Sequence, residues 1–189
     1  MAAKQTGLGQ KKTRGPEVCR RCALTEPTCC SCRPGEEELL PPISLFELAR
    51  MLASRIRASE EDYVVLVANS PAFLKQMGRL FPGQRQTLGR IFPQDGQHLR
   101  LRLDQTNRCA LLGPAGCLLP VRARPLICRL YPFWFAGEKI LVFNNPHCQA
   151  LRENRNITAL HQAFGTSEDK LRRLYLQLCQ ELGLKPAKG

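Results

Sequence analysis

The chain of 189 residues carries 28 Lys and Arg against 16 Asp and Glu, a formal net charge of +12, and it contains ten cysteines. A hydrophobic fraction of 43% with 23% charged residues is ordinary for a folded protein and argues against wholesale disorder. Because no apolar run approaches the roughly 18 residues of a spanning helix and the start lacks a signal peptide, we expect a cytoplasmic protein with no membrane association.

Residues 1–16 are polar and basic and show no apolar period that could pack against a core. We therefore expect a disordered basic tail over this segment and a single cysteine-cluster domain over 17–189. Between residues 17 and 35 cysteines stand where aliphatic residues would normally be. This stretch is predicted to hold its shape by metal ligation rather than by burial.

Helical periodicity becomes clear after the proline pair that precedes residue 43. Apolar residues share one face over 45–56, and Ser44 and Glu47 have the spacing of a capping box. A serine followed by three acidic residues predicts another helix over 59–68. Ser70 before a proline predicts the start of a third helix.

The second half of the chain adds short strands. Leucines alternate with polar residues over 99–103, and an apolar run at 139–143 is ended by two asparagines and a proline. The related pentapeptides GRLFP (78–82) and GRIFP (89–93) are predicted to be turns that carry buried apolar side chains. A final amphipathic helix is predicted from about Ser167. The fold class is α+β: a small, predominantly helical domain with short antiparallel strands, organised around cysteine-ligated metal.

Nine of the cysteines fall into two groups. Clustered cysteines in a chain without a secretion signal are more often metal ligands or catalytic groups than disulfides. The CxxC spacing of Cys19 and Cys22 lets both thiolates reach one metal. Adjacent side chains diverge, so Cys29 and Cys30 are predicted to divide between two metals or between two edges of one cluster. Cys179 lies apart, beside the stripe of the final helix, and is predicted to be a packed core thiol.

The order of the motifs is CxxC, a CC pair, two capped helices, two further cysteines, RPxxCRxYP over 124–132, and a last cysteine. Over residues 19–150 this order resembles the zinc- or iron-chelating cysteine-cluster family, the YkgJ-like proteins. The resemblance implies zinc or iron as cofactor, with an iron–sulfur cluster as an alternative, and implies no defined reaction. It marks eight metal-site positions: Cys19, Cys22, Cys29, Cys30, Cys109, Cys117, Cys128 and Cys148.

Two features leave alternatives within this ligand set. The gap between Cys22 and Cys29 is longer than in the family pattern, which makes Cys32 a rival to Cys29 or Cys30. His147 precedes Cys148 and could substitute for it as a nitrogen ligand.

The basic residues are concentrated in the middle of the chain. Residues 75–129 hold ten basic and two acidic side chains, and nine of the ten are arginines. Four thiolates around Zn²⁺ leave a net charge of −2, so some arginines are predicted to stabilise the sulfur site. The candidates, each with the alternative of a solvated surface position, are Arg108, Arg122, Arg124 and Arg129. Changing Arg129 to Ala is predicted to loosen metal retention.

The aromatic run at 131–135 is predicted to pack in the core beneath the cysteines rather than to stack on nucleic-acid bases.

The sequence leaves three functions open. Eight candidate ligands suit two four-coordinate sites, which favours a metal-chelating protein. One alternative is a metal-dependent redox or group-transfer enzyme, because longer relatives with a similar cluster include lysine methylases acting on flagellin; no independent catalytic motif supports it. The other is a nucleic-acid-binding protein with structural zinc, using the basic tail and the arginine-rich segment.

Overall fold

The computed structural model describes residues 17–186 except 26, 57, 58 and 155. The tail predicted over 1–16 lies outside the described residues. The fold is α+β, with helices joined by three antiparallel strand pairs, β1–β2, β3–β4 and β5–β6. The helices are α1 (Glu17–Cys22), α2 (Leu45–Ala53), α3 (Pro71–Leu80), α4 (Arg85–Ile91), α5 (Leu126–Leu130), α6 (Gln149–Glu153), α7 (Ile157–Phe164) and α8 (Glu168–Glu181). The strands are β1 (Val64–Ala68), β2 (Gln97–Leu101), β3 (Leu112–Gly113), β4 (Gly116–Cys117), β5 (Phe133–Ala136) and β6 (Lys139–Val142).

Three predicted helix starts are confirmed, each with a serine at the N-cap. Ser44 caps α2 in a reciprocal capping box, in which its hydroxyl accepts the Glu47 N–H and the Glu47 carboxylate accepts the Ser44 N–H. Ser70 caps α3, and Ser167 caps α8. Local sequence therefore determines where these helices begin.

The helix predicted over 59–68 is wrong. The N–H and the hydroxyl of Ser59 both donate to the Asp62 carboxylate at 3.1 Å, and only a short 3-10 turn (Glu60–Asp62) follows. The chain then enters β1, whose sequence VVLVA pairs antiparallel with β2, Val64 opposite Leu101. The β-branched residues favour the strand, and pairing with a segment about 35 residues downstream outweighs the helix-start signal.

The two related pentapeptides are helix ends rather than free turns. In α3 the chain leaves the helix at Phe81 (φ −126°, ψ 68°), and in α4 it leaves at Phe92 (φ −124°, ψ 73°). Each phenylalanine N–H donates to the carbonyl four residues earlier, of Met77 and Leu88. Both rings are buried, as predicted, so the repeated sequence builds the same helix terminus twice.

The buried side chains form two hydrophobic clusters. The larger, which we call the main core, joins α3, α4, α5, β5 and α8 and contains the aromatic residues Phe133, Trp134 and Phe135. The smaller, the side core, joins α2 to β1 and to Leu111 and Leu119. The prediction that the aromatic run packs in the core is confirmed.

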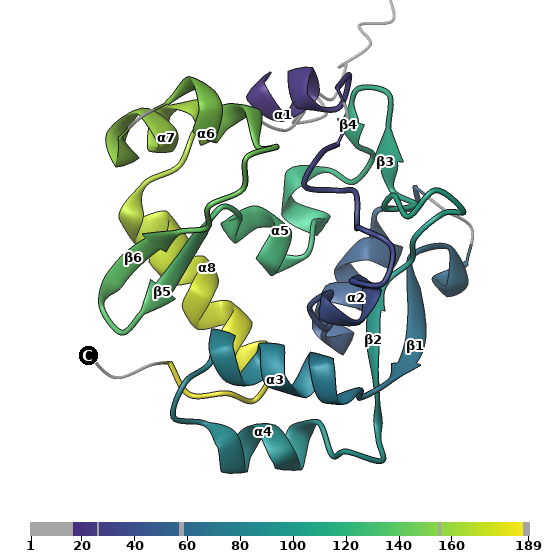
Figure 1. The fold of residues 1–189 in the computed structure, drawn as a ribbon. Coiled ribbons are helices and arrows are strands. Elements are labelled where there is room, and N and C mark those ends of the chain that lie inside the picture. The colour runs from purple at the N-terminus through teal and green to yellow at the C-terminus, as the bar shows by residue number, and fades with distance from the viewer. Residues whose placement is uncertain (1–16, 26, 57–58, 155, 187–189) are drawn as a thin grey trace, which may run out of the picture.

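Figure 1 shows α5 near the centre of the molecule, with α1 at one edge and the α3–α4 pair at the opposite edge. No helix in the described ranges is both long enough and apolar enough to span a bilayer.

Candidate metal centre

Backbone pairing brings the N-terminal cysteines to the downstream ones. The segment after α1 runs antiparallel to residues 107–109: the Cys109 N–H donates to the Cys30 carbonyl and the Cys32 N–H to the Asn107 carbonyl, each at 2.8 Å. A bridge between Ser31 and Arg108 lies in the same pairing. The remaining positions come from secondary structure: Cys19 and Cys22 from α1, Cys117 from β4, Cys128 from α5 and Cys148 from the N-cap of α6.

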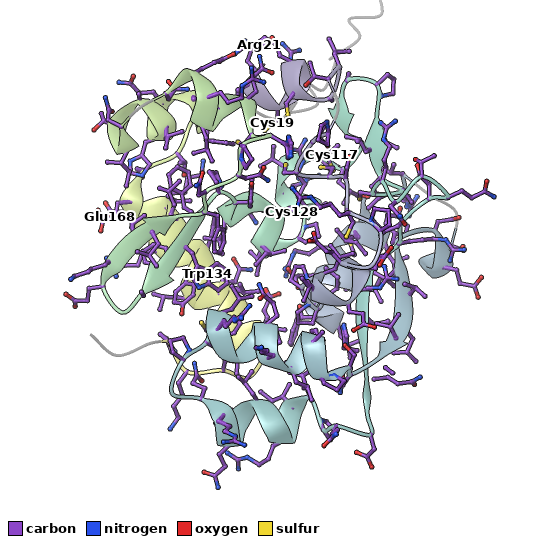
Figure 2. The ribbon with its side chains drawn as sticks, in the orientation of Figure 1. Cys19, Arg21, Cys117, Cys128, Trp134 and Glu168 are labelled. Carbon is purple, nitrogen blue, oxygen red and sulfur yellow. The ribbon has the colours of Figure 1, made fainter. Side chains whose placement is uncertain are left out.

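Helix α1 is held between β4 and α6. Gly116 has φ +96°, a backbone conformation that favours glycine, and a Cβ atom there would be in ordinary contact with the Cys19 carbonyl oxygen at 3.7 Å. On the other side, the Arg21 guanidinium donates to both carboxylate oxygens of Glu153 at 2.8 and 2.7 Å. Figure 2 shows Arg21 at the outer edge, with Cys19, Cys117 and Cys128 below it toward the centre.

The thiols of one group act on each other electrostatically around α1 and α6. Burial raises the pKa of Cys19 to about 12; Arg124 lowers it, and the charges of Cys30, Cys22 and Cys148 raise it. Burial also raises the pKa of Cys148, and Cys22 adds to that rise. The charges of Cys22 and Cys148 therefore act on Cys19, and that of Cys22 acts on Cys148, although α1 and the N-cap of α6 are far apart in the sequence.

A second set gathers around α5. Burial raises the pKa of Cys128, and the charges of Cys30, Cys109 and Cys117 raise it further. Burial raises the pKa of Cys109 to about 12, with smaller contributions from Cys30 and Cys117. Cys30 also raises the pKa of Cys117, whose main cause is burial. Cys30 is thus a neighbour of every thiol in this set.

The adjacent pair Cys29 and Cys30 joins the two sets. The Cys29 thiol donates a hydrogen bond to the Cys30 sulfur, which lowers the pKa of Cys30 and raises that of Cys29. The positive charges of Arg124 and Arg108 lower the Cys30 pKa further. Burial acts in the opposite direction and raises the pKa of Cys30.

Cys29 and Cys128 both keep exposed surface. The surrounding protein nevertheless desolvates both thiols, and this desolvation contributes to the raised pKa of each.

Two of the four predicted arginines lie among the thiols. Arg124 donates from Nε to the Leu119 carbonyl at 3.0 Å and from Nη2 to the Cys117 carbonyl at 3.4 Å. Its charge lowers the pKa of Cys19, Cys30 and Cys117. Arg108 acts on Cys30.

The other two arginines are placed differently. Arg129 is partly buried, which lowers its pKa, and the charges that act on it come from Arg50, Glu181 and Glu47. Arg122 is exposed. We therefore expect Arg124, rather than Arg129, to support the sulfur site.

Sequence reasoning missed a second role of Glu47. This carboxyl is 1% exposed, and Oε1 accepts the Leu126 N–H at 2.6 Å while Oε2 accepts the Ser44 N–H at 2.8 Å. Leu126 opens α5, so one side chain ties the start of α2 to the helix that carries Cys128. The capping-box pattern identified Glu47, but no local signal indicates a bond to a residue 79 positions away.

The remaining cysteines lie elsewhere. Burial raises the pKa of Cys32, and the charges that act on it are those of Glu37, Glu36 and Arg100, not of any thiol. Cys179 is 0% exposed in the main core, which confirms the prediction of a packed thiol. The His147 N–H donates to the Asn145 side chain, and its role as a ligand stays a prediction.

The eight predicted thiols share one region without converging tightly. Each of them acts on the pKa of another or responds to another. Nevertheless, within the described part of the chain no three His, Cys, Asp or Glu side chains lie close enough together to hold a metal ion. The donor chemistry suits zinc or iron, since thiolates are preferred ligands of both and Arg124 and Arg108 supply nearby positive charge.

Comparisons of the chain with models of protein families, with curated proteins and with solved structures gave no match.

Proposed function

We propose that this protein chelates zinc or iron, as an ion or as an iron–sulfur cluster, through eight thiolates. One observation carries the proposal. The eight positions marked by the family resemblance are the cysteines whose charges act on one another, whereas Cys32 and Cys179 act on none of them. Six separate segments supply these eight residues, so their meeting is a property of the fold and not of sequence proximity.

We assign the eight thiols to two adjoining centres of four ligands each. The charges of Cys22 and Cys148 act on Cys19, and those of Cys29, Cys148 and Cys22 act on Tyr131, so we group Cys19, Cys22, Cys29 and Cys148 as the α1 centre. The charges of Cys30, Cys109 and Cys117 act on Cys128, so we group these four as the α5 centre. Cys30 also acts on Cys19, and Cys128 also acts on Cys29, so the two centres adjoin.

The two hydrophobic clusters favour the same division. Cys148 belongs to the main core and Cys19 packs against it, whereas Cys109 and Cys117 pack against the side core. Two ligands of each centre therefore pack beside different clusters, while α5, which carries Cys128, packs in the main core. We place Cys29 in one centre and Cys30 in the other. The hydrogen bond between these thiols keeps their sulfur atoms close together, so the two centres would adjoin at this pair.

Charge balance also supports the proposal. Two Zn²⁺ ions with four thiolates each would carry about −4 together, which is costly among desolvated thiols without compensation. Arg124 is the positive charge that acts on thiols of both centres, Cys19 in one and Cys30 and Cys117 in the other. The positive charge of Arg124 would therefore offset part of the negative charge of both centres.

Single-cysteine variants test the division. Cys22→Ser should remove the metal of the α1 centre and leave that of the α5 centre, and Cys109→Ser should do the reverse. Elemental analysis of protein purified without oxygen should give about half the metal of the wild type for each variant.

Cys32→Ser is the matched control, because it removes a thiol from the same stretch of chain without touching either centre, and its metal content should equal that of the wild type. Loss of metal from the Cys32 variant would contradict the ligand set. Loss of all metal from both Cys22→Ser and Cys109→Ser would contradict two independent centres.

A further inference from the structure

The helices α3 and α4 expose four cations. Lys75 and Arg79 lie four residues apart on one side of α3, and Arg85 and Arg90 are exposed at the start and near the end of α4. Residues 71–94 contain no Asp or Glu. Among the residues that the structure describes, none of these four side chains has a hydrogen-bond or ion-pair partner.

These cations are not counter-charges of the sulfur centres. Figure 1 shows α3 and α4 at the edge of the molecule opposite α1, and Figure 2 places Cys19 and Cys117 near that α1 edge. The arginines that act on the thiol pKa values are Arg124 and Arg108. The charge of the α3–α4 pair therefore needs an explanation outside the metal site.

The glycines of the repeated pentapeptides are exposed on the same two helices. Gly78 in α3 and Gly89 in α4 are exposed helical residues, and a Cβ atom built at either would have no neighbour within 4 Å. Packing inside the molecule thus gives no reason for glycine, although glycine weakens a helix relative to alanine. In both helices the glycine is followed directly by an exposed arginine, Arg79 or Arg90.

We propose that the exposed face of α3 and α4 binds the phosphate backbone of double-stranded nucleic acid. The four cations, which we call the α3–α4 cation row, contact phosphates, and Gly78 and Gly89 let the sugar-phosphate chain approach the helix backbones. Arginine is well suited to this role because its planar guanidinium can bind phosphate with two parallel hydrogen bonds.

The composition of the exposed side of α3 and α4 favours a nucleic-acid duplex over a protein or a membrane. A protein interface is built around a buried apolar or aromatic core, and a membrane-surface helix inserts an apolar face into lipid. Here the apolar faces of both helices, with Phe73, Met77 and Leu88, are buried in the main core. The exposed residues are cations, glycines, a glutamine and small side chains, with no exposed aromatic ring for stacking on single-stranded bases. Backbone contacts to a duplex need neither an apolar nor an aromatic anchor.

The test is the salt dependence of duplex binding by the full chain with its metal. Neutralising the row should reduce the slope of log K against log salt by about 3.6, the value for four phosphate contacts to DNA. The probe is a short DNA or RNA duplex of random sequence, followed by fluorescence anisotropy. The row variant is Lys75→Gln with Arg79→Gln, Arg85→Gln and Arg90→Gln. The charge-matched control changes four exposed cations elsewhere, Arg33, Lys139, Arg152 and Arg173, to Gln.

The control should keep most of the wild-type slope, and both variants should keep the wild-type metal content, which separates this proposal from the metal centre. Equal slopes for the row variant and the control would overturn the proposal, as would absence of duplex binding at low salt. Tighter binding to anionic phospholipid vesicles than to the duplex would overturn it in favour of a membrane surface. Gly78→Ala with Gly89→Ala should raise Tm and weaken duplex binding; unchanged affinity would overturn the role of the glycines.

Discussion

At the scale of single residues, Arg124 and Glu47 support the candidate centres from different sides. Arg124 brings positive charge to the thiols and is fixed by two backbone carbonyls. Glu47 brings no ligand but fixes the start of α5 by accepting the Leu126 N–H. Each residue acts through a contact that can be removed separately.

Replacing Arg124 by Gln should weaken metal retention by about tenfold, the lower end of what loss of a supporting residue costs at metal sites. The reason is that the Cys19, Cys30 and Cys117 thiolates lose the cation that lowers their pKa values. The measurement is the rate of metal transfer to a coloured chelator. Arg124→Lys keeps the charge and should recover part of the loss.

Arg129→Gln is the control, because Arg129 interacts with Arg50, Glu181 and Glu47 instead of the thiols. It should leave the transfer rate near that of the wild type. Faster metal loss from the Arg129 variant than from the Arg124 variant would restore the assignment predicted from the sequence.

Replacing Glu47 by Gln should lower the free energy of unfolding by about 1–3 kcal/mol, since an amide has one acceptor oxygen for two buried N–H groups. Urea unfolding measures the change. Ser44→Ala is the comparison, because it removes the helix cap, at a cost of about 1 kcal/mol, and keeps the bond to Leu126. In addition, only Glu47→Gln should speed metal loss from the α5 centre. Equal metal loss from the two variants would show that Glu47 acts as a cap alone.

At the scale of elements, the sequence indicated helices well wherever a cap and an apolar stripe agreed. The starts at Ser44, Ser70 and Ser167 are examples. It failed over 59–68, where the acidic start looked helical but the β-branched residues of β1 pair with β2. Such pairing depends on a partner about 35 residues away, and local periodicity carries no information about it.

The same limit applies to the candidate site. The positions of the thiols could be predicted because CxxC, the CC pair and RPxxCRxYP are local patterns. Which arginines lie beside the thiols could not be predicted. The directions of the Arg124 and Arg129 side chains depend on the backbone of η3 (Val121–Ala123) and of α5. The contact of Glu47 with Leu126 likewise depends on the packing of α2 against α5.

The β1–β2 pair contains a pH-sensitive element. His98 is buried, its Nδ1 is hydrogen-bonded to the side-chain oxygen Oδ1 of Asn69 at 2.8 Å, and its ring stacks on Phe73 with centroids 3.7 Å apart. Burial, with a smaller contribution from Arg100, lowers the pKa of His98 from 6.5 to about 4. The unfolded chain therefore binds a proton between pH 6.5 and pH 4 that the folded chain does not bind, so stability falls as the pH is lowered through this window.

The expected loss is up to about 3 kcal/mol between pH 7 and pH 4, taking 1.36 kcal/mol for each unit of pKa difference. His98→Gln can still donate to Asn69 but does not titrate. Urea unfolding of both proteins from pH 7 to pH 4 should therefore show a steeper fall for the wild type. Loss of metal at low pH affects both proteins alike, so their difference isolates His98. Parallel curves would contradict this account.

At the scale of the whole molecule, the proposed ligands contact both hydrophobic clusters. Cys19 and Cys148 pack with the main core, and Cys109 and Cys117 pack against the side core. Metal bound to both centres would crosslink segments far apart in the chain and so restrict the unfolded state as a covalent link does. The apo protein should then unfold at a lower temperature than the metal-loaded protein.

The metal-to-protein ratio of the wild-type protein, purified without oxygen and measured together with its visible absorption spectrum, tests the central claim most directly. The account predicts two four-thiolate centres. These would be seen as about two Zn²⁺ per chain in a colourless protein, or as iron with sulfide and a visible spectrum when a cluster occupies one centre. A folded, colourless protein that contains no metal, and whose Tm is unchanged by a strong chelator, would contradict it.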